Sequence, residues 1–154
     1  MGILKFGFPE RLFYDNKEDS IAFLDGLDID LTIEPLYNYP TLGQVKIAIR
    51  ETTFQADVGQ IVTEPNKTKW VCGLYKGGEL KTPIYIEDVQ EDIDKVKSIY
   101  FQRGDDEAIF EFLRCLSKFC GSIVFYHDSG NIVVVRESKT IEQLKQELGY
   151  YIKD

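Results

Sequence analysis

Residues 105–137, with the sequence DDEAIFEFLRCLSKFCGSIVFYHDSGNIVVVRE, contain the clearest helix and the clearest hairpin of the chain. Apolar residues recur at helical spacing over 105–120, and three acidic residues stand at its start, where the helix dipole favours negative charge. Gly121 follows directly. Two runs, 122–126 and 132–136, then flank a polar turn that is typical of a β-hairpin. The apolar stripe of the predicted helix consists of Ile109, Phe112, Leu113, Leu116, Phe119 and Cys120.

The chain before this segment predicts one early helix and a series of short strands. Asp15 followed by Glu18 is typical of a capping box, and the helix that it starts is expected to end at Gly26. Residues 28–34 alternate strictly between polar and apolar side chains, which predicts a half-buried strand with Ile33 facing inward. The predicted strands are 2–8, 28–34, 44–50, 57–63, 69–76 and a short one around Ile99 and Phe101.

The remaining signals complete the expected order of elements. Thr140 with Gln143 forms a second capping box and predicts a final helix. Residues 84–97 leave open whether Asp88 to Lys97 forms a short acidic helix or a loop. Because most strand connections read as hairpins, we expect an α+β fold with a largely antiparallel sheet of about six or seven strands and two or three helices packed on one face. The length predicts a single α+β domain over 1–154.

Charge limits the classes of partner. The formal net charge is −8, which disfavours nucleic acid and anionic membrane surfaces and favours a basic protein. The first residues lack the apolar core of a signal peptide, and no apolar run reaches membrane-spanning length. We therefore expect a cytoplasmic protein. The sequence gives no indication of its oligomeric state.

The sequence shows no familiar catalytic or metal-binding pattern. The single histidine, His127, stands in the hairpin turn beside Asp128 and Ser129, whereas triad residues normally converge from separate elements. Cys115 and Cys120 fall in the middle and at the end of their helix, away from the end that lowers a thiol pKa. Ligand pairs such as Cys-x-x-Cys and Gly-rich phosphate loops do not occur. We predict no catalytic residue, no metal site and no cofactor.

Acidic residues cluster in three stretches, 15–34, 87–94 and 105–111. The third lies at a predicted helix start, which explains it. The second holds five acids and no basic residue, so the mutual repulsion of these acids favours a basic partner. Tyrosines beside this stretch and in the loop between Pro35 and Pro40 are typical interface anchors. The predicted partner-binding residues are Glu87, Asp88, Glu91, Asp92, Asp94, Tyr85, Tyr37 and Tyr39.

Residues 121–137 read Gly-Ser-Ile-Val-Phe-Tyr-His-Asp-Ser-Gly-Asn-Ile-Val-Val-Val-Arg-Glu and follow directly on a helix. In a small acidic α+β protein, this arrangement resembles bacterial immunity proteins of polymorphic-toxin and contact-dependent-inhibition systems. The resemblance covers the last third of the chain and implies a class rather than particular site residues. That class binds a cognate toxin and blocks its active site. Many such toxins are nucleases with basic clefts, into which an acidic inhibitor is steered by charge.

Three hypotheses follow for function. The first is an immunity-type inhibitor that neutralises a basic toxin through the residues named above. The second is a small enzyme or ligand-binding domain with an unconventional carboxylate or cysteine site, which predicts a deep pocket. The third is a structural, oligomerising domain, which predicts a large apolar self-interface. The acidic composition favours the first.

Overall fold

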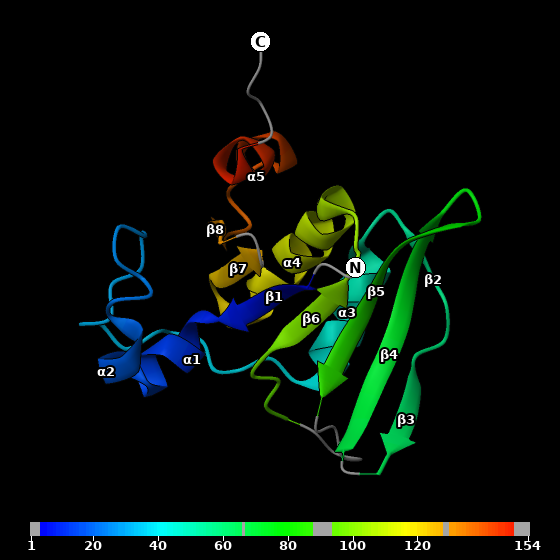
Figure 1. Ribbon diagram of the computed structural model, residues 1–154, viewed down its shortest axis with the longest axis horizontal. Helices are drawn as coiled ribbons and strands as arrows, with labels where there is room; N and C mark the ends of the chain where they lie inside the picture. Colours follow the sequence, from blue (N-terminus) through cyan, green and yellow to red (C-terminus); the bar gives the residue numbers. More distant parts are fainter. Residues whose placement is uncertain (1–3, 66, 88–93, 128–129, 150–154) are drawn as a thin grey trace.

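The computed structural model describes residues 4–65, 67–87, 94–127 and 130–149. Within these ranges the chain forms eight strands and five helices, which are labelled in Figure 1. The strands are β1 (Leu4–Pro9), β2 (Gln55–Ala56), β3 (Gln60–Glu64), β4 (Lys67–Lys76), β5 (Glu79–Glu87), β6 (Ile99–Gln102), β7 (Ile123–His127) and β8 (Ile132–Val135). The helices are α1 (Glu10–Asp15), α2 (Lys17–Ser20), α3 (Leu42–Glu51), α4 (Asp106–Cys120) and α5 (Ile141–Leu148).

One antiparallel sheet contains all eight of these strands. Its order is β2-β4-β5-β6-β1-β7-β8, and β3 also pairs with β4. The first strand therefore lies between β6 and β7, which come from the second half of the chain. The predicted α+β fold class is confirmed. Within the described residues the sheet has eight strands, one more than the six or seven expected, and there are five helices instead of two or three.

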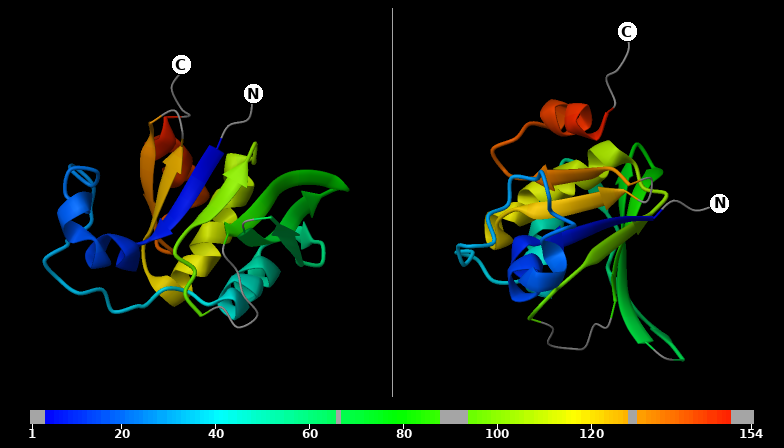
Figure 2. Two further views of the ribbon diagram at one scale, coloured as in Figure 1. Left: turned by 60° about the horizontal axis from the view of Figure 1, so that its bottom comes forward. Right: turned by 60° about the vertical axis from the view of Figure 1, so that its left-hand side comes forward.

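Helices cover the two faces of the sheet unequally. The larger core joins α3, α4 and α5 to the strands β4 to β8, and in Figure 1 α3 and α4 lie behind these strands. A smaller core on the other face joins Phe13 of α1 and Leu24 to Val124 of β7. Figure 2 shows α1 and α2 on the side of the sheet that holds β1 and β7, away from β3 and β4. Among the residues that the structure describes, no helix covers the outer face of β4, β5 and β6.

Helix α4 lies at the centre of the larger core, and its sequence explains its ends. The Asp105 carboxylate accepts a hydrogen bond from the Ala108 amide at 3.1 Å and so caps the first turn. Gly121 stops the helix with a φ of 78°, a conformation that favours glycine. The predicted stripe is buried except for Phe119, which is partly buried against the same core. The helix predicted over 105–120 and the hairpin that follows are both confirmed.

A buried ion pair fastens α4 to β1. The Lys5 ammonium donates to Asp106 Oδ1 at 2.7 Å and to the Gly104 carbonyl at 2.6 Å. The two side chains are 8% and 5% exposed. A buried charge is tolerated when it is paired and hydrogen-bonded, so this pair couples the position of the first strand to that of the central helix.

The strand predicted over 44–50 is wrong, because this segment forms α3. The Thr41 hydroxyl accepts from the Gln44 amide at 3.0 Å, and the Gln44 side chain accepts from the Thr41 amide, which completes a capping box. Val45 and Ile49 are buried, as the predicted strand also required. Ile47 is more than a third exposed, so the buried residues follow helical spacing.

The strand predicted over 28–34 is also wrong. This segment has no strand partner and runs irregularly along the outside of the β7–β8 end. Ile29 and Leu31 pack against the smaller core, whereas Ile33 points into solvent with 64% of its surface exposed. Alternation alone does not make a strand, because a strand also needs an edge with which to pair.

The early helix differs from its prediction. Asp15 ends α1 instead of capping a helix, and a second short helix, α2, ends at Ser20. The predicted helix would bury Ile21, Phe23 and Leu24. Leu24 is buried, whereas Ile21 and Phe23 are 65% and 37% exposed. Gly26 lies in a turn with a φ of 83°, which is consistent with a break in the chain direction at this residue.

The strands predicted over 2–8, over 69–76 and around Ile99 and Phe101 are confirmed where the structure describes them, whereas the strand predicted over 57–63 begins only at Gln60. Residues 84–87 belong to β5, and 94–98 have no regular structure. The possible helix over 88–97 falls mostly outside the described residues. The capping box of Thr140 and Gln143 is formed and starts α5.

Candidate protein-binding surface

The predicted site residues around the second acidic stretch lie at the end of β5 and after it. The Tyr85 ring stacks on the Tyr100 ring with centroids 4.8 Å apart. Glu87 pairs with Lys67 across the sheet at 2.8 Å, so part of its charge is already balanced. Asp94 is exposed. The other three predicted acids, Asp88, Glu91 and Asp92, lie outside the described residues.

The two tyrosines of the Pro-bounded loop have different environments. Tyr39 is 7% exposed, and its hydroxyl donates to Asp15 Oδ2 at 2.7 Å. Burial, reinforced by this hydrogen bond to a carboxylate, raises the pKa of Tyr39 to about 12. Tyr39 therefore offers little surface to a partner. Tyr37 is 45% exposed and lies against Gly121, close to the start of β7. Tyr85 lies on β5, and β6 and β1 separate β5 from β7 in the sheet.

Aromatic rings form a row across the outer face of the sheet. Tyr85, Tyr100, Phe6 and Tyr126 are directly paired on four neighbouring strands. Neighbouring rings in this row lie 4.8 to 6.4 Å apart, and Phe23 packs against Tyr126 at one end. The rings are half-buried by one another, so Tyr85 belongs to a packed row rather than standing free as an anchor.

A cavity of about 370 Å³ lies between the 28–37 segment and the C-terminal end of α4. It is called the acidic groove below. Four carboxylates line it against one guanidinium, so negative charges outnumber positive ones in its lining. The residues that line the acidic groove are Glu10, Asp28, Ile29, Asp30, Ile33, Glu34, Pro35, Leu36, Tyr37, Gly121, Ser122 and Arg136.

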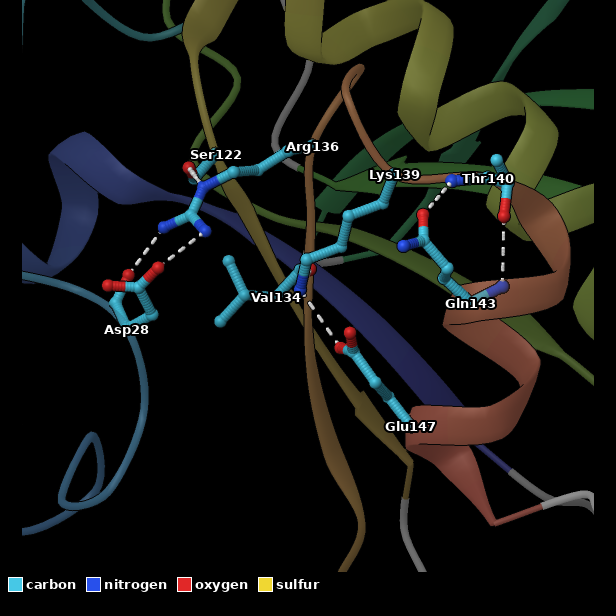
Figure 3. A network of polar contacts seen from close by, with 8 residues as sticks. All are labelled: Asp28, Ser122, Val134, Arg136, Lys139, Thr140, Gln143 and Glu147. Atoms are coloured by element: carbon cyan, nitrogen blue, oxygen red, sulfur yellow. Dashed lines mark hydrogen bonds and ion pairs between the residues drawn. The ribbon is translucent and has the colours of Figure 1, made fainter.

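Arg136 holds the first end of the 28–37 segment, as Figure 3 shows. Its Nε donates to Ser122 Oγ at 2.8 Å, and its Nη1 pairs with Asp28 Oδ2 at 2.9 Å. Its Nη2 donates to the Asp28 carbonyl. A guanidinium that contacts both the side chain and the backbone of one residue fixes the orientation of that residue. The Asp28 side chain nevertheless stays 89% exposed.

Arg11 of α1 holds the other end of the segment. It pairs with Glu34 Oε2 at 3.1 Å and donates to the carbonyls of Pro35 and Tyr37 at 3.2 and 3.3 Å. Between the two arginines, Asp30 accepts from the Thr32 hydroxyl and amide at 2.6 and 2.9 Å. These hydrogen bonds lower the pKa of Asp30. The irregular segment is thus pinned at both ends and ordered locally.

Large apolar side chains project from this pinned segment. Ile33 is 64% exposed and Leu36 is 95% exposed, and both line the acidic groove with Tyr37. Exposed apolar side chains within a polar rim are typical of interaction sites. The arrangement therefore supplies apolar anchors, surrounding negative charge and a fixed backbone on one surface.

The cysteines are placed for packing. Burial, with a smaller contribution from the Asp57 charge, raises the pKa of the Cys72 thiol to about 12. Burial raises the pKa of the Cys120 thiol to about 12 and that of Cys115 in the same direction. Thiols with raised pKa values are poor nucleophiles at neutral pH.

The described ranges contain neither a metal-ion cluster nor a helix able to span a membrane. They contain no cluster of three or more His, Cys, Asp or Glu side chains arranged to hold a metal ion. In the same ranges, no helix combines the length and apolar character needed to cross a bilayer.

Sequence reasoning missed most of the acidic groove. It singled out Tyr37, but it expected Ile33 to be buried in a strand and did not consider Leu36, Arg136 or Glu10. The contribution of Arg136 had no local signal, because it contacts Asp28 from 108 residues away.

Comparison of the chain with protein-family models, with curated proteins and with solved structures found no significant match.

Proposed function

We propose that this protein binds a basic protein partner through the acidic groove and acts as an immunity-type inhibitor of that partner. The single observation that carries the proposal is the pinned 28–37 segment. It presents Ile33 and Leu36 to solvent within a rim of carboxylates. The composition of the chain also favours a basic partner, since its net charge is −8.

The apolar side chains account for affinity in this proposal. Interface energy is concentrated in a few anchors that lose their contact with water, surrounded by polar residues. Leu36, at 95% exposure, gains most from being covered. Because Arg11 and Arg136 already order the segment, little conformational entropy is lost on binding.

The carboxylates account for rate and selectivity. A field of one sign attracts a basic partner over a distance set by the ionic strength and repels acidic proteins. Asp28 and Glu34 keep most of their surface exposed although each is paired with an arginine. A lysine or arginine of the partner can therefore reach them. An inhibitor seated in this way covers the basic cleft in which a nuclease binds its substrate.

Capture from the native organism with three matched baits tests this proposal. The first bait is the natural protein, and the second carries Ile33→Ser, Leu36→Ser and Glu34→Gln. The control bait carries Ile61→Ser, Leu80→Ser and Glu79→Gln, at two apolar positions that are 54% and 49% exposed and at a surface ion pair, Glu79 with Lys81 at 3.2 Å. Circular dichroism of all three baits verifies their folding.

The expected result is a basic protein that the natural and control baits retain at low salt and release in a salt gradient. The groove variant should lose it. Equal retention by the groove variant, or a partner that ignores salt, would contradict the proposal. A fourth bait with Glu87→Gln and Asp94→Asn tests the surface that the sequence predicted, and we expect it to retain the partner.

A further inference from the structure

A second cavity, of about 320 Å³, lies at the opposite end of the sheet, where α3 faces β4. Its size falls at the lower end of the range for small-molecule sites. Its walls come from α3, from the 56–59 segment and from β4. It shares no lining residue with the acidic groove. It is called the Trp70 pocket below.

Contacts to β4 hold the outer wall of the Trp70 pocket in place. Asp57 Oδ1 accepts from the Gly73 amide at 2.8 Å, and Cys72 Sγ donates to the Asp57 carbonyl at 3.4 Å. Gly59 lies flat on the indole, since a Cβ at this residue would fall 2.2 Å from Trp70 Cζ2. The pocket is therefore formed before any ligand enters it.

The rim of the pocket carries two cations without carboxylate partners in the described part of the chain. Lys46 and Arg50 stand four residues apart on α3, so they share one face of the helix and repel each other. The Lys46 ammonium lies 6.0 Å from the centre of the Trp70 ring. The nearby Asp57 carboxylate is engaged by hydrogen bonds to β4. In a chain with a net charge of −8, this local excess of one positive charge favours an anion.

The rest of the lining is apolar. Ile49 and Ala56 face the cavity beside the edge of the indole, and Val58 stands at the mouth with 83% of its surface exposed. A ligand with an apolar body would cover Val58 and remove this surface from water. An inorganic anion would leave it exposed.

We propose that the Trp70 pocket binds a small organic monoanion, in which one acidic head group is attached to an apolar or planar body. The head group lies between Lys46 and Arg50, and the body lies against Ile49, Val58 and the edge of Trp70. This site does not depend on the acidic groove, so either proposal can fail without the other.

The single tryptophan of the chain provides the measurement. Its indole N–H gives one isolated peak in a proton–nitrogen correlation spectrum, which is followed during titration with hydrocinnamate. Hydrocinnamyl alcohol is the neutral probe of the same shape, and inorganic phosphate is the anion without an apolar body. We expect a saturable shift with a Kd below about 1 mM for hydrocinnamate and binding at least about tenfold weaker for the other two.

Two charge-matched variants complete the test. Lys46→Gln with Arg50→Gln should weaken hydrocinnamate binding about tenfold or more. Lys17→Gln with Lys95→Gln removes the same charge elsewhere and should leave the Kd unchanged. Circular dichroism and thermal unfolding verify the fold of each variant, because the Lys46 ammonium lies 6.0 Å from the Trp70 ring and its removal can itself shift the indole peak. The proposal is overturned by the absence of a saturable shift up to about 10 mM, by equal affinity for the alcohol or phosphate, or by an unchanged Kd in the Lys46 and Arg50 variant.

Discussion

Replacing Lys5 by Met tests whether the buried ion pair couples the first strand to the central helix. Methionine keeps most of the aliphatic volume of lysine, so the change mainly leaves the Asp106 carboxylate buried without its ammonium partner. Removing one partner of a buried pair costs about 3–5 kcal/mol of unfolding free energy. For a chain of 154 residues, each kcal/mol lowers Tm by about 2–4 °C, so we expect a loss of about 10 °C.

Urea and thermal unfolding followed by circular dichroism measure this effect, and a neighbouring pair is the control. Lys145 pairs with Glu107, also in the first turn of α4, at 3.2 Å but with the two side chains 27% and 53% exposed. Lys145→Met should therefore cost less than about 1 kcal/mol. Replacing both buried partners, with Lys5→Met and Asp106→Leu, should recover much of the lost stability. If Lys5→Met destabilises the protein no more than Lys145→Met does, the buried pair does not couple β1 to α4.

Three further predictions concern thiols, alkaline pH and the pinned segment. Cys72 and Cys120, whose thiol pKa values burial raises to about 12, should react with Ellman's reagent at pH 8 about a hundredfold more slowly in the native protein than in denaturant. Burial and the hydrogen bond to Asp15 raise the pKa of Tyr39 to about 12 in the folded protein. The protonated Tyr39 hydroxyl therefore contributes to the free energy of unfolding below pH 10, and this contribution is lost as the pH rises toward 12. The unfolding free energy should fall over that interval, and Tyr39→Phe should lower it by about 1 kcal/mol at neutral pH and flatten the alkaline loss. Arg136→Gln should release one end of the 28–37 segment, which limited proteolysis will detect as earlier cleavage there, whereas an unchanged cleavage rate would show that Arg136 does not hold it.

The elements that the sequence predicted correctly are those whose signals are local. One continuous segment holds the apolar stripe of α4, its Asp105 cap and Gly121. The hairpin of β7 and β8 was likewise indicated by the polar residues between its two strands. Helix α3 carried the same kind of signal in Thr41 and Gln44, but Val45 and Ile49 satisfy strand and helix spacing equally. Capping chemistry would have resolved this ambiguity, since it distinguishes a helix start from a strand.

The acidic groove could not be predicted because contacts distant in sequence create it. Residues 28–34 carry a regular alternation, yet their position depends on whether the sheet offers them an edge. Arg11 and Arg136, respectively 23 and 108 residues away from the partners they bind, hold the segment outside the sheet and leave Leu36 exposed. The charge of the region was evident from composition, whereas the combination of that charge with apolar anchors required the fold.

Zero-length cross-linking of the captured complex shows whether the partner contacts the acidic groove. A carbodiimide joins carboxylates to lysines that contact them, and mass spectrometry identifies the linked residues. We expect links from Asp28, Asp30 or Glu34 to lysines of the basic partner, and the loss of these links at high salt. Links that come instead from Glu87 and Asp94, with none from the 28–37 segment, would contradict binding through the acidic groove.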